Sequence, residues 1–268
     1  MAHAELLIIG SAFIPEERER LEAHCPSTFI NTAEEIAALA PDLRAGLRMI
    51  AYKSQRPLTA AHMGLLPALG LVANFGVGFD AIDIAAADAR GIRVTNTPDV
   101  LSDDVADLAV AMLLAQFRTL RRGEDWVRSG LWAERGEMPL NRQISGTAAG
   151  IVGLGRIGRE IANRLAAFKM PVHYTSRSEK QTPGWTYHPD PVALAQAVDV
   201  LVVALVGGPD TRNAISAQVI DALGPRGVLI NISRGSTVDE PALLDALEQG
   251  RLAGAGLDVF WNEPTIDP

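Results

Sequence analysis

Short apolar runs alternate with stretches of helical periodicity along the whole chain. In the N-terminal part we predict strands at residues 5–10, 27–31, 48–52, 71–75 and 92–95. Helical patterns lie between them, at residues 15–24, 32–39, 60–66 and 82–89. The helix at 32–39 is predicted to open on a capping box, formed by Thr32 with Glu35. Strands that alternate with helices favour a parallel sheet covered on both faces.

A second unit of the same kind follows the breaker cluster Asn96-Thr-Pro-Asp99. Strands are expected at residues 147–152, 172–175, 199–205, 227–232 and 253–259, with helices at 157–165, 190–198, 216–223 and 239–248. The fold class is therefore predicted to be α/β, with two doubly wound parallel-sheet domains at residues 1–98 and 99–268.

A long helix from Ser102 to about Leu120 opens this second unit. It is more apolar than one face requires, which predicts cover on several sides, by the domain junction or by a second subunit. Residues 126–141 are predicted to be irregular. Their apolar side chains Trp132, Met138 and Leu140 would either reach a partner or pack on their own domain.

The strand predicted at 147–152 runs into Gly153, Gly155 and Gly158, which have G-x-G-x-x-G spacing, and a helical pattern follows at once. In a dinucleotide site the first glycine makes the turn, the second lets backbone approach the pyrophosphate, and the third lets helix pack on strand. The helix N-terminus then offers N–H groups and a positive dipole to the phosphates. Glycine-rich turns alone are common, but strand, glycines, helix and second strand in one unit predict a dinucleotide site.

The second strand of this unit ends in Ser176, Arg177 and Ser178, with no carboxylate before Glu179. A site for NAD usually carries Asp or Glu here, to accept hydrogen bonds from the ribose 2′-OH. Arginine instead pairs with a 2′-phosphate, and the two hydroxyls can donate to it. The alternative is a solvated turn; we predict NADP(H) as the cofactor.

The composition argues against nucleic acids and membranes as binding partners. The net charge is −8 and the sequence pI about 5.2, so no broad basic surface favours nucleic acid or an anionic membrane. Cys25 is the single cysteine and has no companion ligands, so we expect neither an internal disulfide nor a metal site. No secretory signal is recognised, and the longest apolar run, Val200–Val206, is far shorter than a membrane helix. We expect a cytoplasmic protein.

Two further loops follow predicted strands, at the edge where open α/β sheets bind ligands. The first, Asn231–Glu240, carries Arg234 immediately beyond its strand. The second, Gly256–Pro264, carries Asp258 at the strand end and Glu263 in the following turn. A loop arginine or a glutamate before proline is often only a surface residue, but this position makes each a candidate for chemistry.

Taken together, these segments resemble the D-2-hydroxyacid dehydrogenase family, and most closely its hydroxypyruvate/glyoxylate reductase branch. The matching segments are Val77–Asp83, Val94–Val100, Asp103–Leu108, the glycine fingerprint, Ser176–Ser178, Asn231–Ala242 and Gly254–Pro264. The resemblance implies a flavodoxin-like substrate domain, a Rossmann cofactor domain inserted into it, and an active cleft between them. It also implies a homodimer built largely through the cofactor domains.

The resemblance also implies roles for individual residues. Arg234 would hold the carboxylate of a 2-oxo acid and polarise its carbonyl group, and Glu263 would hydrogen-bond the catalytic histidine. Asp258 would accept from the nicotinamide carboxamide. Further cofactor contacts would come from Leu154, Gly155, Arg156, Ile157, Ile232 and Ser233, and backbone N–H groups for the substrate carboxylate from Val77 and Gly78. Lys53 and Ser54 are weaker candidates, with solvated side chains as the alternative.

The family's acid/base histidine lies beyond the position of Glu263, and the sequence ends at Pro268. His3, His24, His62, His173 and His188 match no catalytic motif, and His173 is predicted to be a structural residue within a strand. A further strand and the long helix that returns to the substrate domain are also expected after Pro268. We therefore expect these residues to be a stretch of a longer protein.

The sequence thus suggests NADPH-dependent reduction of a small 2-oxo acid, glyoxylate or hydroxypyruvate, to the 2-hydroxy acid. One alternative is a reductase of bulkier or aromatic 2-oxo acids, because a few loop residues set substrate size. Another is a dinucleotide-sensing, corepressor-like binding protein. The presence of both Arg234 and Glu263 argues against a sensor, which needs no proton relay.

Overall fold

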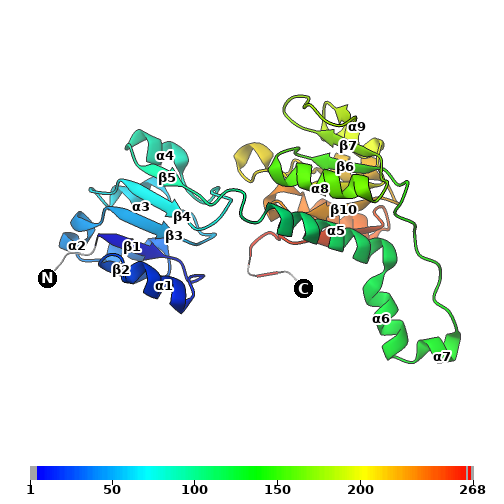
Figure 1. Cartoon of the computed structure of the whole chain (residues 1–268), viewed down its shortest axis with the longest axis horizontal. Helices are drawn as coiled ribbons and strands as arrows, with labels where there is room; N and C mark the ends of the chain where they lie inside the picture. Colours follow the sequence, from blue (N-terminus) through cyan, green and yellow to red (C-terminus); the bar gives the residue numbers. More distant parts are fainter. Residues whose placement is uncertain (1–4, 264, 267–268) are drawn as a thin grey trace. The chain divides into compact units, whose positions relative to one another are not determined.

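A computed structural model describes residues 5–263 and 265–266. The chain divides into two compact units, Met1–Val100 and Leu101–Pro268 (Figure 1). Each unit contains one parallel sheet with helices around it, so the predicted α/β class with two parallel-sheet domains is confirmed.

The first unit is a five-stranded sheet of order β2-β1-β3-β4-β5, the flavodoxin-like order. Its strands are β1 (Leu6–Ile9), β2 (Ser27–Ile30), β3 (Met49–Tyr52), β4 (Leu71–Asn74) and β5 (Arg93–Thr95). Its helices are α1 (Pro15–Glu22), α2 (Pro41–Gly46), α3 (Ala60–Gly64) and α4 (Ile84–Ala89), with the 3-10 helix η1 at Ala33–Ala38. Leu7 and Ile9 belong to one core cluster and Leu6 and Ile8 to another, so β1 is buried on both faces.

The second unit is a six-stranded sheet of order β11-β10-β9-β6-β7-β8. Its strands are β6 (Ala149–Val152), β7 (Val172–Thr175), β8 (Thr186–His188), β9 (Val200–Val203), β10 (Val228–Asn231) and β11 (Gly254–Leu257). Its α-helices are α5 (Ser102–Arg118), α6 (Leu120–Arg128), α7 (Leu131–Arg135), α8 (Arg156–Ala167), α9 (Pro191–Gln196), α10 (Ala217–Leu223) and α11 (Glu240–Glu248), and 3-10 helices lie at Pro209–Thr211 (η2) and Gly235–Thr237 (η3). Counted from β6, this is the Rossmann order, which reverses direction between β6 and β9.

Two apolar layers enclose the second sheet. Ile151, Val202 and Ile230 face a cluster completed by α5 and α8. Val152, Val203 and Leu229 face the cluster formed with α9, α10 and α11. Because the strands are covered on both sides, the carboxyl edge of the sheet is the place that its topology leaves for ligands.

The prediction of an irregular segment at 126–141 is wrong in its first part. Thr119 adopts a left-handed conformation (φ 45°), which ends α5, and α6 begins at the next residue. α6 and α7 project as an arm from the sheet of this unit (Figure 1). Neither helix buries a residue, and the indole N–H of Trp126 ties the arm together by donating to the Gly136 carbonyl at 3.0 Å.

Three shorter elements, η1, α2 and β8, also differ from the predictions. The helix predicted at 32–39 is the 3-10 helix η1, although the Glu35 carboxylate does accept from the Thr32 N–H at 3.0 Å, as the capping box requires. α2 and the three-residue edge strand β8 were not predicted, because neither is long enough to show a period. Among the described residues, no helix is sufficiently long and apolar to cross a membrane.

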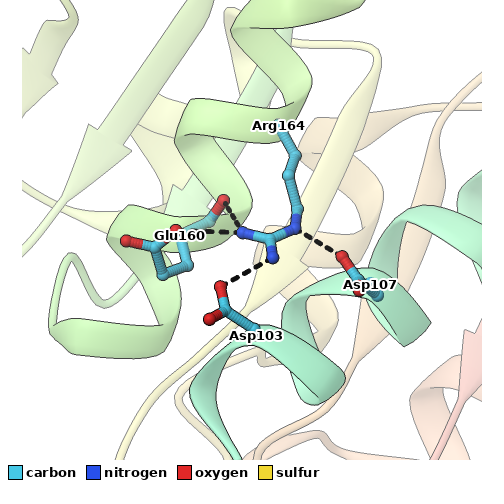
Figure 2. A network of polar contacts seen from close by, with 4 residues as sticks. All are labelled: Asp103, Asp107, Glu160 and Arg164. Atoms are coloured by element: carbon cyan, nitrogen blue, oxygen red, sulfur yellow. Dashed lines mark hydrogen bonds and ion pairs between the residues drawn. The ribbon is translucent and has the colours of Figure 1, made fainter. Parts of the chain in front are cut away.

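α8, which begins directly after the second fingerprint glycine, is joined to α5 by the Arg164 guanidinium (Figure 2). Arg164 donates to Asp103 at 2.8 Å and to Asp107 at 2.6 Å, both on α5. It also donates to Glu160, one turn earlier on α8, at 2.9 Å. The hydrogen bonds to Asp103 and Asp107 are the main causes that raise the pKa of Arg164 above its usual value. A charge cluster therefore fixes the face of α8 that lies against α5.

We predict that Arg164→Ala lowers the free energy of unfolding by about 1–2 kcal/mol, since three partly exposed ion pairs are worth roughly 0.2–1 kcal/mol each. The expected fall in Tm is about 3–6 °C at low salt and smaller at high salt, measured by calorimetry. Arg128→Ala is the control, because among the described residues Arg128 pairs with Glu124 alone, within the exposed helix α6. Equal Tm changes for the two variants would contradict a bridging role for Arg164.

Candidate active site

The three fingerprint glycines lie where β6 passes into α8, and their surroundings differ. Gly153 has φ 99°, and a Cβ there would lie 2.7 Å from the Ala204 carbonyl oxygen. A Cβ on Gly158 would lie 2.1 Å from the Gly153 carbonyl oxygen, whereas one on Gly155 would meet nothing within 4 Å. The first and third glycines therefore permit the chain to pack on itself, and the second leaves open space in front of the helix.

The first turn of α8 has backbone donors for an anion in that space. Gly155 is its N-cap and supplies no side-chain cap. Leu154 is buried and Ile157 partly buried against the core shared with α5, so their side chains hold the turn in place. Arg156 is exposed at the start of the helix. An uncapped N-terminus of this kind binds phosphate through its N–H groups and dipole.

The loop after β7 closes on the buried phenol of Tyr174. The Tyr174 hydroxyl donates to the Lys180 carbonyl at 3.0 Å and accepts from the Lys180 N–H at 2.8 Å. Within the loop, Ser176 Oγ donates to the Ser178 carbonyl at 2.6 Å. Arg177 and Ser178 are exposed, and Lys180 Nζ lies 3.3 Å from Ser178 Oγ. The closed loop thus brings a second cation, Lys180, beside the residues predicted to bind the 2′-phosphate. The sequence signal that could have identified Lys180 is its position three residues after Arg177.

Arg234 follows β10, and its main chain is firmly held. Its carbonyl accepts from Asn231 Nδ2 at 2.9 Å, from Thr237 Oγ1 at 2.7 Å and from the Thr237 N–H at 3.1 Å. Asn231 also accepts from the Ser233 N–H at 3.0 Å, and Ser233 Oγ donates to the Leu205 carbonyl at 2.6 Å. Ile232 and Ser233 are buried, which fixes the backbone before the half-buried Arg234.

The loop after β11 lies directly against the Arg234 loop. A Cβ on Gly235 would lie 2.1 Å from the Phe260 carbonyl carbon, so the two backbones are in close contact. Asp258 is exposed at the strand end, and its N–H donates to the Asn231 carbonyl at 3.0 Å. Glu263 is exposed, and one carboxylate oxygen accepts from the Phe260 N–H at 2.8 Å. The structure therefore brings the Arg234 loop and the Asp258–Glu263 loop to one edge of the sheet.

The loop with Val77 and Gly78 belongs to the first unit, where it follows β4. Its carbonyl groups are held by side-chain amides: Asn74 donates to Gly76 at 3.0 Å and to Gly78 at 2.8 Å, and Asn96 donates to Val77 at 2.9 Å. Among the described residues, the N–H groups of Val77 and Gly78 donate to no protein acceptor. Such a loop presents donors for an anion.

The other candidates of the first unit are engaged elsewhere. Lys53 Nζ lies 2.7 Å from Glu17 Oε2, and both side chains are about 30% exposed, so Lys53 is not simply solvated. Its hydrogen bond to Glu17, followed by that from the Ile14 N–H, lowers the pKa of the Glu17 carboxyl. Ser54 Oγ accepts from the Arg56 N–H at 3.1 Å.

The histidines that the structure describes take structural positions. His173 on β7 lies 2.9 Å from His188 on β8, ring nitrogen to ring nitrogen, and burial together with the charge of His188 lowers the pKa of His173. His62 accepts from the Thr59 N–H at the start of α3, and His24 contacts the Arg20 carbonyl. His3 lies outside the described residues. No group of three or more possible metal ligands gathers in the described part of the chain.

The chain is similar to several known proteins. Residues 110–268 match the model of the NAD binding domain of D-isomer specific 2-hydroxyacid dehydrogenases. The chain is 46% identical over 235 residues to a glyoxylate/hydroxypyruvate reductase A of Arabidopsis thaliana, covering 88% of this chain and 75% of that one. It is 48% identical over 220 residues to a hydroxyphenylpyruvate reductase of Plectranthus scutellarioides, covering 82% and 70%.

Among solved structures, one similar protein is an NADPH-dependent glyoxylate/hydroxypyruvate reductase from Sinorhizobium meliloti in complex with NADP and malonate. Its TM-score is 0.91 at 44% identity, covering 99% of this chain and 82% of that one. A 2-hydroxyacid dehydrogenase from Ketogulonicigenium vulgare gives a TM-score of 0.88 at 45% identity, covering 100% and 84%.

We predict that Gly155→Ala leaves Tm unchanged but weakens dinucleotide binding at least tenfold, because the new methyl group occupies only the space left for the pyrophosphate. Calorimetry and fluorescence titration of the full-length protein measure the two effects. Gly70→Ala, which also meets nothing within 4 Å, is the control and should change neither. Unaltered dinucleotide affinity in the folded Gly155→Ala variant would place the pyrophosphate elsewhere.

Proposed function

The chain belongs to the D-isomer specific 2-hydroxyacid dehydrogenase family, and within it we propose an NADPH-dependent reductase of glyoxylate or hydroxypyruvate. The observation that carries the proposal is the position of Arg234. It lies at the carboxyl edge of the sheet whose β6–α8 turn carries the dinucleotide fingerprint, on a main chain fixed by Asn231 and Thr237. The first unit is the substrate domain and the second the cofactor domain.

The cofactor assignment is supported by the chemistry of two places. The pyrophosphate binds beside Gly155, where the backbone N–H groups at the N-terminus of α8 donate to its oxygens. Ser176, Arg177 and Ser178 bind the 2′-phosphate, with charge-assisted hydrogen bonds from the guanidinium. Asp258 accepts from the nicotinamide carboxamide, and Ile232 and Ser233 give backbone contacts. A similar solved reductase holds NADP, which favours the same cofactor here.

The protein's residues bind the oxo acid and supply charge where the reaction needs it. The bound dinucleotide supplies the hydride. Arg234 holds the substrate carboxylate and polarises the carbonyl group, whose oxygen gains negative charge as the hydride arrives. The N–H groups of Val77 and Gly78 hold the carboxylate from the substrate domain. The two interactions orient the 2-oxo acid and stabilise the charge of the transition state.

The reduction also consumes one proton, which is delivered to the carbonyl oxygen. The family's histidine, which the resemblance places after Pro268, is the donor, and the Glu263 carboxylate favours its protonated form. Glu263 is held for this role by the Phe260 N–H. Activity is therefore measured on the full-length protein.

A homodimer is proposed on the arm formed by α6 and α7. Leu120, Val127 and Trp132 are exposed there, and so are Leu140, in the segment after α7, and Leu108 on α5. Apolar side chains gathered on a projecting element favour a subunit interface. Sedimentation equilibrium tests the homodimer, and a monomer would contradict it.

We place the protein in the cytoplasm, which cell fractionation tests.

The function is tested by following NADPH oxidation with glyoxylate, hydroxypyruvate, pyruvate and 4-hydroxyphenylpyruvate. We expect the highest kcat/KM with glyoxylate or hydroxypyruvate, and a fall of about 10²–10³-fold in Arg234→Ala while the Kd of NADPH changes less than about twofold. A preference for 4-hydroxyphenylpyruvate would favour an aromatic 2-oxo acid as substrate. No turnover of any 2-oxo acid would favour the dinucleotide sensor.

For the cofactor preference, we predict that Arg177→Ala raises the Kd of NADPH about tenfold or more and that of NADH less than about twofold. The reason is that only NADPH loses a charge-assisted contact to a phosphate. Fluorescence titration with both nucleotides measures this, with Arg93→Ala, an exposed arginine on β5, as the control. Equal losses for NADPH and NADH would remove the assignment of the 2′-phosphate to this loop.

A further inference from the structure

Asn74, the last residue of β4, holds the loop that follows this strand. Its side chain is only 7% exposed. The Nδ2 group donates to two main-chain carbonyls of the following loop, Gly76 at 3.0 Å and Gly78 at 2.8 Å. One amide nitrogen therefore holds two peptide groups that lie two residues apart, with both of its hydrogens in use.

When a main-chain carbonyl is held by a hydrogen bond, the N–H group of the same peptide is fixed as well. In a trans peptide the C=O of one residue and the N–H of the next lie in one plane and point in opposite directions. Fixing the Gly76 carbonyl therefore aims the Val77 N–H away from Asn74. Fixing the Val77 carbonyl, which Asn96 holds at 2.9 Å, aims the Gly78 N–H in the same manner.

The two N–H groups aimed in this way are the pair proposed for the substrate carboxylate. Among the described residues neither donates to a protein acceptor. The Thr97 N–H also donates to the Gly76 carbonyl at 3.1 Å, but within the described part of the chain the Gly78 carbonyl accepts only from Asn74. Without Asn74 the Gly78 carbonyl loses this donor, while the Gly76 carbonyl keeps the Thr97 N–H and the Val77 carbonyl keeps Asn96.

We propose that Asn74 is a positioning residue that, together with Asn96, presets the Val77 and Gly78 N–H groups for the carboxylate of the 2-oxo acid. The inference rests on the proposed function, because it names what these donors bind. Asn74 itself touches no substrate. It removes the conformational freedom of a glycine-rich loop before binding, so that ordering the loop does not weaken substrate affinity.

The role is tested with Asn74→Asp and Asn74→Ser in the full-length protein. Asp has the shape of Asn but no donor, so its carboxylate faces two carbonyl oxygens; Ser keeps one donor. We expect the KM for glyoxylate and the Kd for oxalate, an unreactive dicarboxylate, to rise about tenfold or more in Asn74→Asp and less in Asn74→Ser. The Kd of NADPH should change less than about twofold, since it binds the other unit.

Asn163→Ala is the control, because Asn163 is an exposed residue on α8. An unchanged glyoxylate KM and oxalate Kd in folded Asn74→Asp and Asn74→Ser would overturn the inference, as would a parallel rise in the Kd of NADPH, which indicates general damage. If Asn74→Asp does not fold, the rise in Asn74→Ser decides. Oxalate binding is measured by calorimetry and needs no turnover. If the wild-type protein reduces no 2-oxo acid, the proposed function is wrong, but the oxalate Kd of the variants still tests the role of Asn74.

Discussion

The contact between the first turn of α8 and the end of β6 is the constraint on which the second unit depends. The Gly153 carbonyl lies so close to Gly158 that no side chain fits there, and the Ala204 carbonyl leaves no room for a Cβ on Gly153 either. This contact brings the helix N-terminus to the point where the strand order reverses. Arg164 then holds the far part of α8 to α5, so the position of the helix is fixed at both ends.

Both units use an asparagine at the end of a strand to shape the loop that follows. Asn74 ends β4 and holds the Gly76 and Gly78 carbonyls; Asn231 ends β10 and holds the Arg234 carbonyl. At the carboxyl edge of a parallel sheet the loop carbonyls have no neighbouring strand to pair with, and a buried carbonyl without a donor is costly. A side-chain amide supplies the donor and at the same time orients the group that we propose binds the ligand.

Much of this could be read from the sequence where one local signal decides the structure. Apolar runs located every strand except β8, and glycine spacing located the turn at Gly153. The features that the sequence did not reveal are contacts between distant residues, or elements too short to show a hydrophobic period. The helices α6 and α7 bury no residue, so their sequence pattern resembles that of a loop. Lys180 lies close to Ser178 in a loop that is closed by hydrogen bonds to the Tyr174 hydroxyl. The roles of Asn74 and Asn231 follow from hydrogen bonds that no spacing rule predicts.

The most direct test of the account is a crystal structure of the full-length protein with NADPH and oxalate. We predict the pyrophosphate at the N–H groups of the first turn of α8, beside Gly155, and the 2′-phosphate in contact with Arg177. The oxalate should lie between the Arg234 guanidinium and the N–H groups of Val77 and Gly78. An adenosine phosphate remote from Ser176 and Arg177, or an Arg234 side chain directed away from the nicotinamide and oxalate, would contradict the account.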